Sequence, residues 1–308
     1  MFKRLLLFIH KWLGIALALL FVMWFVSGLV LYYVPFPSLT QAERLAALPE
    51  LKLPAGCCLT AQEAARRAQI QFTEARLGMH PAGPVWRLLG SAEDGGGKAS
   101  SRWHVVDARS GAQLPALSRA QTGALAEAFS GQKVLQAGQV EADQWSTAQS
   151  LDAHRPLLRM VMDGDDGLEL YVSASSGEVL RDTRRTERFW NWLGAIPHWF
   201  YFSQLRQWND ARKNLVVWSS SLGVMAAFSG VVLGVWQLFL NRSRWIPYRS
   251  FWPRWHHIGG LVAGVVTFTW IFSGLLSVNP WHLFSSRAAP ASERAQWLGK
   301  TGAVKLNP

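Results

Sequence analysis

The stretch HKWLGIALALLFVMWFVSG, residues 10–28, is the part of the sequence that decides the fold. It overlaps a run without any charged residue, 12–34, and two more such runs follow at 215–240 and 258–281. A helix rises about 1.5 Å per residue, so each run is long enough to cross about 30 Å of hydrocarbon. One such run fits a buried core helix. Three runs in a chain of 308 residues that is half hydrophobic predict three membrane-spanning helices.

The opening stretch is repeated near the end of the chain, in HHIGGLVAGVVTFTWIFSG at 256–274. The positions that match without gaps are His10 with His256, Gly14 with Gly260, Trp24 with Trp270, and Ser27-Gly28 with Ser273-Gly274. Because the first and third of three spans cross in the same direction, we expect His10 and His256 at the same depth.

The net charge of +11 indicates topology and does not predict binding to nucleic acid. Lys3, Arg4 and Lys11 surround the start of the first span, and the loop 241–255 carries four arginines and no acidic residue. Cytoplasmic segments of membrane proteins are enriched in lysine and arginine. We therefore expect a cytoplasmic N-terminus and loop, with residues 35–210 outside.

The external region 55–182 contains a second repeat, because RWHVVDARSGAQL (102–114) resembles ELYVSASSGEVL (169–180). Each copy predicts a strand, a turn with glycine and a second strand. Helix-like segments precede them at 59–69 and 118–129. The expected domain is two small α+β units in tandem. We find no nucleophile–base pair or paired carboxylates in it, and we interpret its histidines as surface residues.

Two further segments carry specific expectations. Cys57 and Cys58 are the only cysteines; adjacent cysteines bridge only with strain, so we interpret them as incidental. The aromatic stretch FWNWLGAIPHWFYF (189–202) has few charges. It should lie in the membrane interface, which places His198 at the membrane surface.

The expected fold is therefore an α-helical transmembrane bundle of three spans with an extracytoplasmic α+β domain. The predicted segments are the cytoplasmic N-terminus with the first transmembrane helix at 1–34, the α+β domain at 55–182, the interfacial segment at 186–210, the second helix at 211–240, the basic loop at 241–255, the third helix at 256–281, and an external tail at 282–308.

These motifs together resemble the PepSY-associated transmembrane family. The resemblance rests on spans that open with H-x3-G and close with S-G, on the S-G hairpins, on FWNWLGAIPHWFYFSQLR before the second span and on SGLLSVNPW after the third. It implies a multi-pass protein of the bacterial inner membrane whose tandem PepSY-like units are periplasmic. Several members are tied to iron uptake, and some are b-type haem proteins that reduce ferric siderophores.

Family members with the full pattern are duplicated and have four spans, whereas this sequence ends soon after its third span. We expect either a truncated product or a short form. A partner subunit or a second copy could supply the fourth span.

The resemblance makes the repeated histidines candidates for axial ligands of haem b. His10 and His256 are the expected pair, with His257 as an alternative to His256, and Gly14 and Gly260 lie one turn further along each helix, on the histidine's own face. A missing side chain there lets a flat macrocycle approach the backbone. The competing interpretation is that these small residues only pack the helices together.

His198 and His282, on the outer side, are candidates for a second haem, and His198 for a metal ligand. About 26 helical residues separate His256 from His282, or roughly 39 Å, which is too far for efficient one-step electron transfer. Two haem layers would need an iron set deeper in the membrane, an intermediate relay, or an arrangement without His282.

Two classes of function follow. The first is a redox protein that resembles a ferric-siderophore reductase; it would take electrons from quinol or a cytoplasmic donor and pass them outward to a ferric chelate. The second is a non-enzymatic membrane protein whose PepSY-like units regulate or assemble a periplasmic protease or another partner. A b-type haem spectrum distinguishes them.

Overall fold

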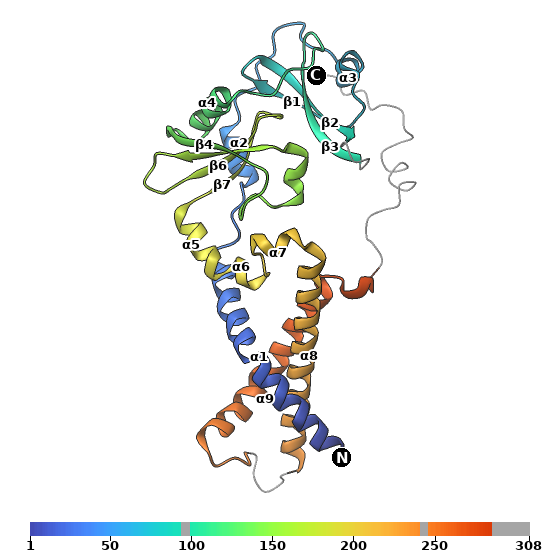
Figure 1. Ribbon diagram of the computed structural model, residues 1–308, viewed down its shortest axis with the longest axis vertical. Coiled ribbons are helices and arrows are strands. Elements are labelled where there is room, and N and C mark those ends of the chain that lie inside the picture. Colours follow the sequence, from blue (N-terminus) through green and yellow to red (C-terminus); the bar gives the residue numbers. More distant parts are fainter. Residues whose placement is uncertain (94–98, 241–245, 285–308) are drawn as a thin grey trace. The chain divides into compact units, whose positions relative to one another are not determined.

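The computed structural model describes residues 1–93, 99–240 and 246–284, and the chain divides into two compact units (Figure 1). Within the described residues, the membrane unit consists of Met1–Tyr33 and Trp192–Phe284. The sheet unit is built by Val34–Asn191. The glycine-rich stretch 93–101, whose composition predicts a loop, lies mostly outside the described residues.

Three helices of the membrane unit are long and apolar enough to cross a membrane, which confirms the predicted spans. They are α1 (Phe2–Tyr33), α8 (Asn209–Leu240) and α9 (Phe251–Ser277). α9 begins at Phe251 and not at the predicted 256, so it includes the end of the loop 241–255. Pro253 is compatible with this start, because the first turn of a helix has no intrahelical acceptor for its N–H groups.

α8 runs antiparallel to α1 and α9, and glycines allow close approach between them. A Cβ atom at Gly234 of α8 would lie 3.0 Å from the Leu261 side chain, and one at Gly264 of α9 would lie 3.1 Å from Val231. At the N-terminal end of α1, the Lys3 Nζ donates a hydrogen bond of 3.3 Å to Gln237 Oε1 near the end of α8.

Short helices occupy the aromatic segment that we predicted to be interfacial, 186–210. They are α5 (Arg185–Leu193), α6 (Ala195–His198) and α7 (Ser203–Gln207). α6 packs against α1 within the membrane unit and holds His198 against Ser27. After α9, Asn279 leads into the 3₁₀ turn η2 (Pro280–His282), in which His282 is exposed.

The sheet unit contains two α+β halves in tandem, as predicted. The first has a three-stranded antiparallel sheet, β1-β2-β3, covered by a helix. Its elements are α3 (Ala61–Ala68), β1 (Phe72–His80), β2 (Gly83–Glu93) and β3 (Ala99–Asp107). The alanine face of α3 packs on Trp86 and Leu88 of β2. Trp86 Nε1 also donates to the Leu59 carbonyl at 2.9 Å, which satisfies its buried N–H.

The second half has a four-stranded antiparallel sheet, β4-β5-β6-β7. Its elements are α4 (Arg119–Ser130), β4 (Val134–Val140), the 3₁₀ helix η1 (Gln149–His154), β5 (Leu157–Met162), β6 (Glu169–Ser173) and β7 (Glu178–Thr183). Ala126 of α4 packs over Met160 and Leu170 of the sheet. A further short helix, α2 (Gln41–Ala47), precedes both halves and is capped by Thr40.

The two predicted hairpins differ in the structure. Gly111 and Gly177 both have positive φ, +80° and +62°, as the turn prediction requires. The second repeat forms the paired strands β6 and β7. In the first repeat the return strand is reduced to a single bridge between Val106 and Gln113, so that part of the hairpin prediction is wrong.

Side chains of the two halves meet at His154, which the sequence led us to place on the surface. That placement is wrong, because only 6% of the residue is exposed. Its ring stacks on Trp103 of β3 with centroids 5.6 Å apart, and its Nδ1 lies 3.0 Å from Ser176 Oγ. The buried Arg87 of β2 joins the same region by donating from Nε to the Ser176 carbonyl at 2.7 Å.

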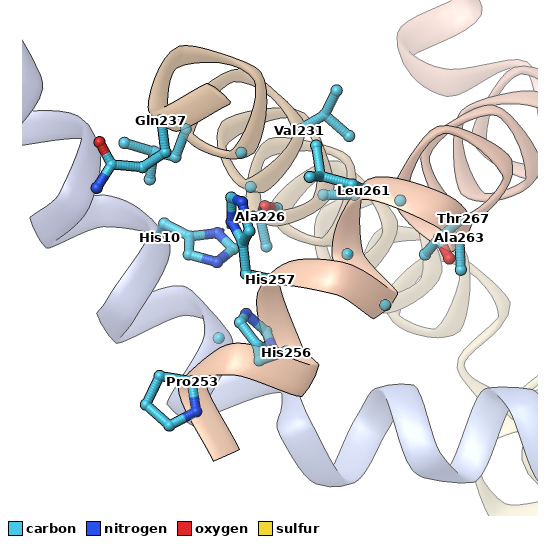
Figure 2. A pocket seen from close by; sticks show the side chains of 18 of the residues that line it. His10, Ala226, Val231, Gln237, Pro253, His256, His257, Leu261, Ala263 and Thr267 are labelled. Carbon is cyan, nitrogen blue, oxygen red and sulfur yellow. Dashed lines mark hydrogen bonds between the residues drawn. The ribbon is translucent and has the colours of Figure 1, made fainter. Parts of the chain in front are cut away.

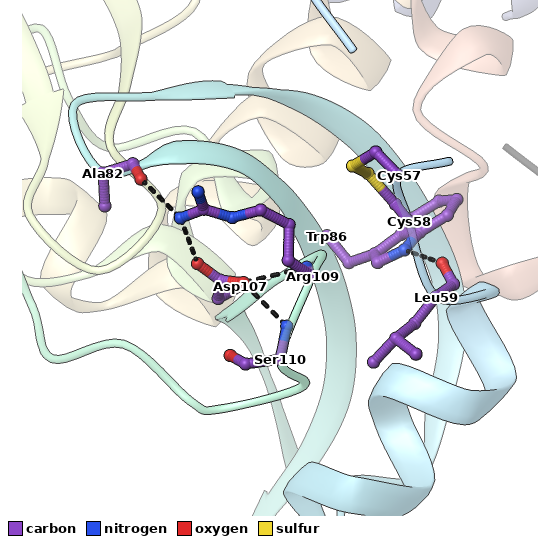
Figure 3. Close-up of a disulfide and its surroundings, with 8 residues drawn as sticks. All are labelled: Cys57, Cys58, Leu59, Ala82, Trp86, Asp107, Arg109 and Ser110. Atoms are coloured by element: carbon purple, nitrogen blue, oxygen red, sulfur yellow. Dashed lines mark hydrogen bonds and ion pairs between the residues drawn. A yellow bond between two sulfur atoms is a disulfide. The ribbon is translucent and has the colours of Figure 1, made fainter. Parts of the chain in front are cut away.

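Cys57 and Cys58 form a disulfide, so the expectation that they are incidental is also wrong (Figure 3). The pair follows a turn in which the Cys57 N–H donates to the Pro54 carbonyl at 3.0 Å. Gly56 supplies the positive φ of that turn, +76°. Cys58 then packs at the edge of the α3 core, beside Leu59.

Candidate functional site: two cavities among the membrane helices

The larger cavity of the membrane unit lies between α1, α8 and α9 and has a volume of about 590 Å³. We call it the inner cavity. Its lining includes five of the sequence-predicted site residues, which are His10, Gly14, His256, His257 and Gly260. Figure 2 shows the three histidines converging from α1 and α9. A volume of this size is typical of sites for small organic ligands and cofactors.

His10 and His256 face each other across this cavity. Their ring centroids are 6.0 Å apart, and the ring planes are inclined by 41°. Gly14 and Gly260 are open positions, because a Cβ atom on either would meet nothing within 4 Å beyond its own helix. The two glycines therefore border open space and are not in contact with each other, which is the opposite of what helix packing alone predicts.

The His10 ring is oriented by α8. Its Nδ1 lies 3.0 Å from the Ala226 carbonyl oxygen and 3.3 Å from Ser229 Oγ. A carbonyl oxygen only accepts hydrogen bonds, so Nδ1 carries the proton and donates it. The lone pair of the neutral imidazole is then on Nε2. This is the usual arrangement of a metal-binding histidine, whose second nitrogen donates to a carbonyl or carboxylate.

Gly230 of α8 leaves the space that the His10 ring occupies. The sequence analysis did not identify Gly230 as a site residue. A Cβ atom there would lie 2.6 Å from His10 Cε1, closer than real carbon atoms approach. Together with Ser229 it forms a Ser-Gly pair that we call the inner cradle. The sequence does contain a pattern that could have identified this pair, because Ser-Gly also occurs at residues 27–28 and 273–274.

His257 has a different environment from its neighbour. Its residue is 8% exposed, and its ring packs against Tyr248 with centroids 5.6 Å apart. Its Nε2 has no hydrogen-bond partner among the residues that the structure describes. His256 is thus the histidine of α9 whose ring faces His10, and His257 is a second imidazole lining the same cavity.

A smaller cavity of about 230 Å³, the outer cavity, lies at the other end of the bundle. His198 lines it, together with aromatic side chains that include Trp24 and Trp270. The His198 Nδ1 is 3.1 Å from Ser27 Oγ, and a Cβ atom at Gly28 would lie 3.1 Å from its Cε1. Ser27-Gly28 is therefore an outer cradle that holds His198 as the inner cradle holds His10.

The outer histidines do not converge in the way that the inner ones do. His282 is exposed and is absent from the residues that line the outer cavity. Burial lowers the pKa of His198, which favours the neutral form of its imidazole. Across the described part of the chain, no group of three or more histidine, cysteine or acidic side chains is placed to hold a metal ion.

Comparison with known proteins places the chain in a family. The model of the PepSY-associated TM region matches residues 7–303, which include α8, α9, the Val34–Asn191 sheet unit and all but the first residues of α1. No curated protein and no solved structure matches the chain. The match covers nearly the whole sequence, and on that basis the chain belongs to the PepSY-associated transmembrane family.

Proposed function

We propose that this protein is a b-type haem protein of the bacterial inner membrane that passes electrons outward to a periplasmic ferric chelate. The observation that carries the proposal is the pair of imidazoles, His10 and His256, that face each other across the inner cavity. His257 is retained as an alternative ligand from α9. Substrates of this class would be ferric siderophores or similar chelates.

The separation of the two rings suits a shared metal. Each ligand nitrogen lies about 2 Å from a bound metal, so two opposed imidazoles place their ring centroids on the order of 6 Å apart. The observed distance is 6.0 Å. The open positions at Gly14 and Gly260 provide room for a flat ring beside the helices. The residues present therefore fit a haem with two axial histidines.

The tautomer that the Ala226 contact selects also suits this role. In the neutral ring, donation from Nδ1 to the Ala226 carbonyl leaves the lone pair on Nε2. The same bond raises the basicity of the ring and fixes its rotation, and Gly230 leaves the space that this rotation needs.

Charge distribution supports the orientation. Lys3, Arg4 and Lys11 lie at the start of α1, and Arg249 and Arg254 lie at the start of α9. Positive charge at these ends is typical of the cytoplasmic side. The inner cavity would then lie near the cytoplasm, and the outer cavity and the sheet unit would lie toward the periplasm.

A bound haem would supply a one-electron couple inside the membrane. His10, oriented by the inner cradle, would hold the haem from one side, and His198 with the aromatic lining of the outer cavity would form the exit toward the acceptor. Quinol or a cytoplasmic protein would be the donor. Reduction of a chelated Fe(III) releases the metal, because Fe(II) is a poorer match for hard oxygen ligands.

The test is an absorption spectrum of the full-length protein purified from haem-replete cells. We expect a b-type spectrum in the wild type and reduced haem content in His10→Ala and His256→Ala. His104→Ala is the control, because His104 is a partly exposed residue of the sheet unit. It is a better control than His154, which is buried in that unit. A haem-free wild type would contradict the proposal and favour a non-enzymatic role in regulating or assembling a partner.

A further inference from the structure

The lining of the inner cavity is polar at one end and aromatic at the other. On α1 the lining residues are Lys3, Leu7, His10, Gly14, Phe21 and Phe25. They follow the spacing of three, four and seven residues that places side chains on one helical face. The cavity thus runs from an ammonium group near the N-terminus of α1, past His10, to phenyl rings nearer the middle of the bundle.

Lys3 turns its charge toward the cavity, whereas its neighbour does not. Lys3 is half-buried and lines the cavity, while Arg4 is exposed. The Lys3 Nζ donates to Gln237 Oε1 at 3.3 Å, and Gln237 and Tyr248 line the same end. Lys3 contacts Gln237, and His10 contacts Gly230. The two contacts are seven residues apart on α1 and seven residues apart on α8.

The Lys3 ammonium has no anionic partner among the described residues. No carboxylate is within ion-pair distance of it, and no described acidic side chain lines the cavity. A lysine ammonium has three donors, of which the Gln237 oxygen takes one. A half-buried cation in an apolar cavity is stabilised when an anion of the ligand pairs with it.

We propose that Lys3, assisted by Gln237, binds the carboxylates of the haem propionates and so sets the direction in which the macrocycle enters the inner cavity. This inference rests on the proposed function. Lys3 is seven residues, or about 10.5 Å along the helix, from His10. It therefore lies at the edge of a macrocycle whose centre is level with His10. The apolar edge of the ring would then face Phe21 and Phe25.

The test compares haem, whose propionates are carboxylates, with its dimethyl ester, in which both are uncharged methyl esters. Full-length apoprotein in detergent is titrated with haem and with haem dimethyl ester, and binding is followed by the absorption spectrum. A charge-assisted hydrogen bond predicts that the wild type binds the free acid roughly tenfold more tightly or better. Lys3→Met keeps an unbranched side chain one atom shorter and removes its charge, so the preference for the free acid should disappear.

Lys11→Met is the matched control. Lys11 is on the same helix, is exposed, and has its Nζ 5.4 Å from the centroid of the Trp12 ring, and it does not line the cavity. It should keep the wild-type preference. Equal wild-type affinity for both ligands, or an unchanged preference in Lys3→Met, overturns the role of Lys3 and indicates that its charge faces lipid headgroups. Failure of the wild type to bind either ligand overturns the haem assignment itself.

Discussion

The imidazole of His10 lies so close to Gly230 that a Cβ atom at position 230 would stand 2.6 Å from the ring's Cε1. The position of the His10 ring on α1 thus requires that residue 230 of α8 has no side chain. The same relationship occurs between His198 and Gly28, where the distance would be 3.1 Å. Each histidine also lies beside the serine that precedes its glycine.

The first prediction concerns Gly230→Ala. The added methyl group should displace the His10 ring and break its bond to the Ala226 carbonyl. Loss of such an orienting contact lowers metal affinity by roughly 10-fold or more, and we expect haem affinity to fall accordingly. Haem titration of the purified protein measures this change.

Gly223→Ala is the control for this prediction. Gly223 is on the same helix, and its Cβ atom would be 3.6 Å from the nearest atom, on Ile271, an ordinary contact. This variant should bind haem as the wild type does, because the added methyl group meets no clash. Alanine also has a higher helix propensity than glycine. Unchanged haem affinity in Gly230→Ala would contradict the prediction, because it would show that the His10 ring can move without weakening haem binding.

The second prediction separates the two outer histidines. His198→Ala should slow electron transfer to an external, membrane-impermeant ferric chelate, because His198 lines the outer cavity. His282→Ala should not, because His282 is exposed and does not line that cavity. The measurement is chelate reduction by proteoliposomes supplied with quinol, with membrane insertion checked for both variants. A slower rate in His282→Ala alone would contradict the assignment.

The third prediction concerns topology. Three spans with a cytoplasmic N-terminus place residue 150 outside and residue 248 inside. Reporter fusions at these two positions should therefore be active in opposite compartments. Activity of both fusions on one side of the membrane would rule out this topology.

The fourth prediction concerns pH and the sheet unit. Burial lowers the pKa of His154 from 6.5 to about 4, so the folded protein holds this ring neutral. Above pH 6.5 the ring is neutral in both folded and unfolded states, and its contribution to stability is complete. As the pH falls from 6.5 to 4, only the unfolded state gains the proton. Up to about 3 kcal/mol of stability is then lost.

Hydrogen exchange of the full-length protein at pH 7 and at pH 5 tests this effect. After correction for the slower intrinsic exchange at low pH, amides of β3 and η1, which carry Trp103 and His154, should have lower protection factors at pH 5 than at pH 7. His154→Phe retains a ring to stack on Trp103 and has no proton to gain, so its protection factors should change less between the two pH values. Equal pH dependence in the variant would assign the effect to another group.

Much of the architecture could be predicted from local patterns. Three charge-free runs, each longer than 20 residues, predict spans from local composition alone, because hydrocarbon excludes unpaired polar groups. The turns at Gly111 and Gly177 follow from residue type in the same way. The return segment after Gly111 does not extend into a strand, although the Leu114 N–H donates to the Val105 carbonyl at 2.8 Å and Val106 forms a bridge with Gln113. The length of a paired strand depends on tertiary contacts that residue type alone does not show. The burial of His154 was likewise decided by Trp103, from a distant part of the chain.

The sequence by itself determined that His10 and His256 begin equivalent spans at one depth, since both follow from position along a helix. It could not determine which way each ring points. That depends on the rotation of each helix about its axis, which is set by contacts with the other helices. Only the tertiary structure showed that His256 faces His10 while His257 packs on Tyr248. Only α8, which the repeat did not include, provides the carbonyl and the glycine that orient His10.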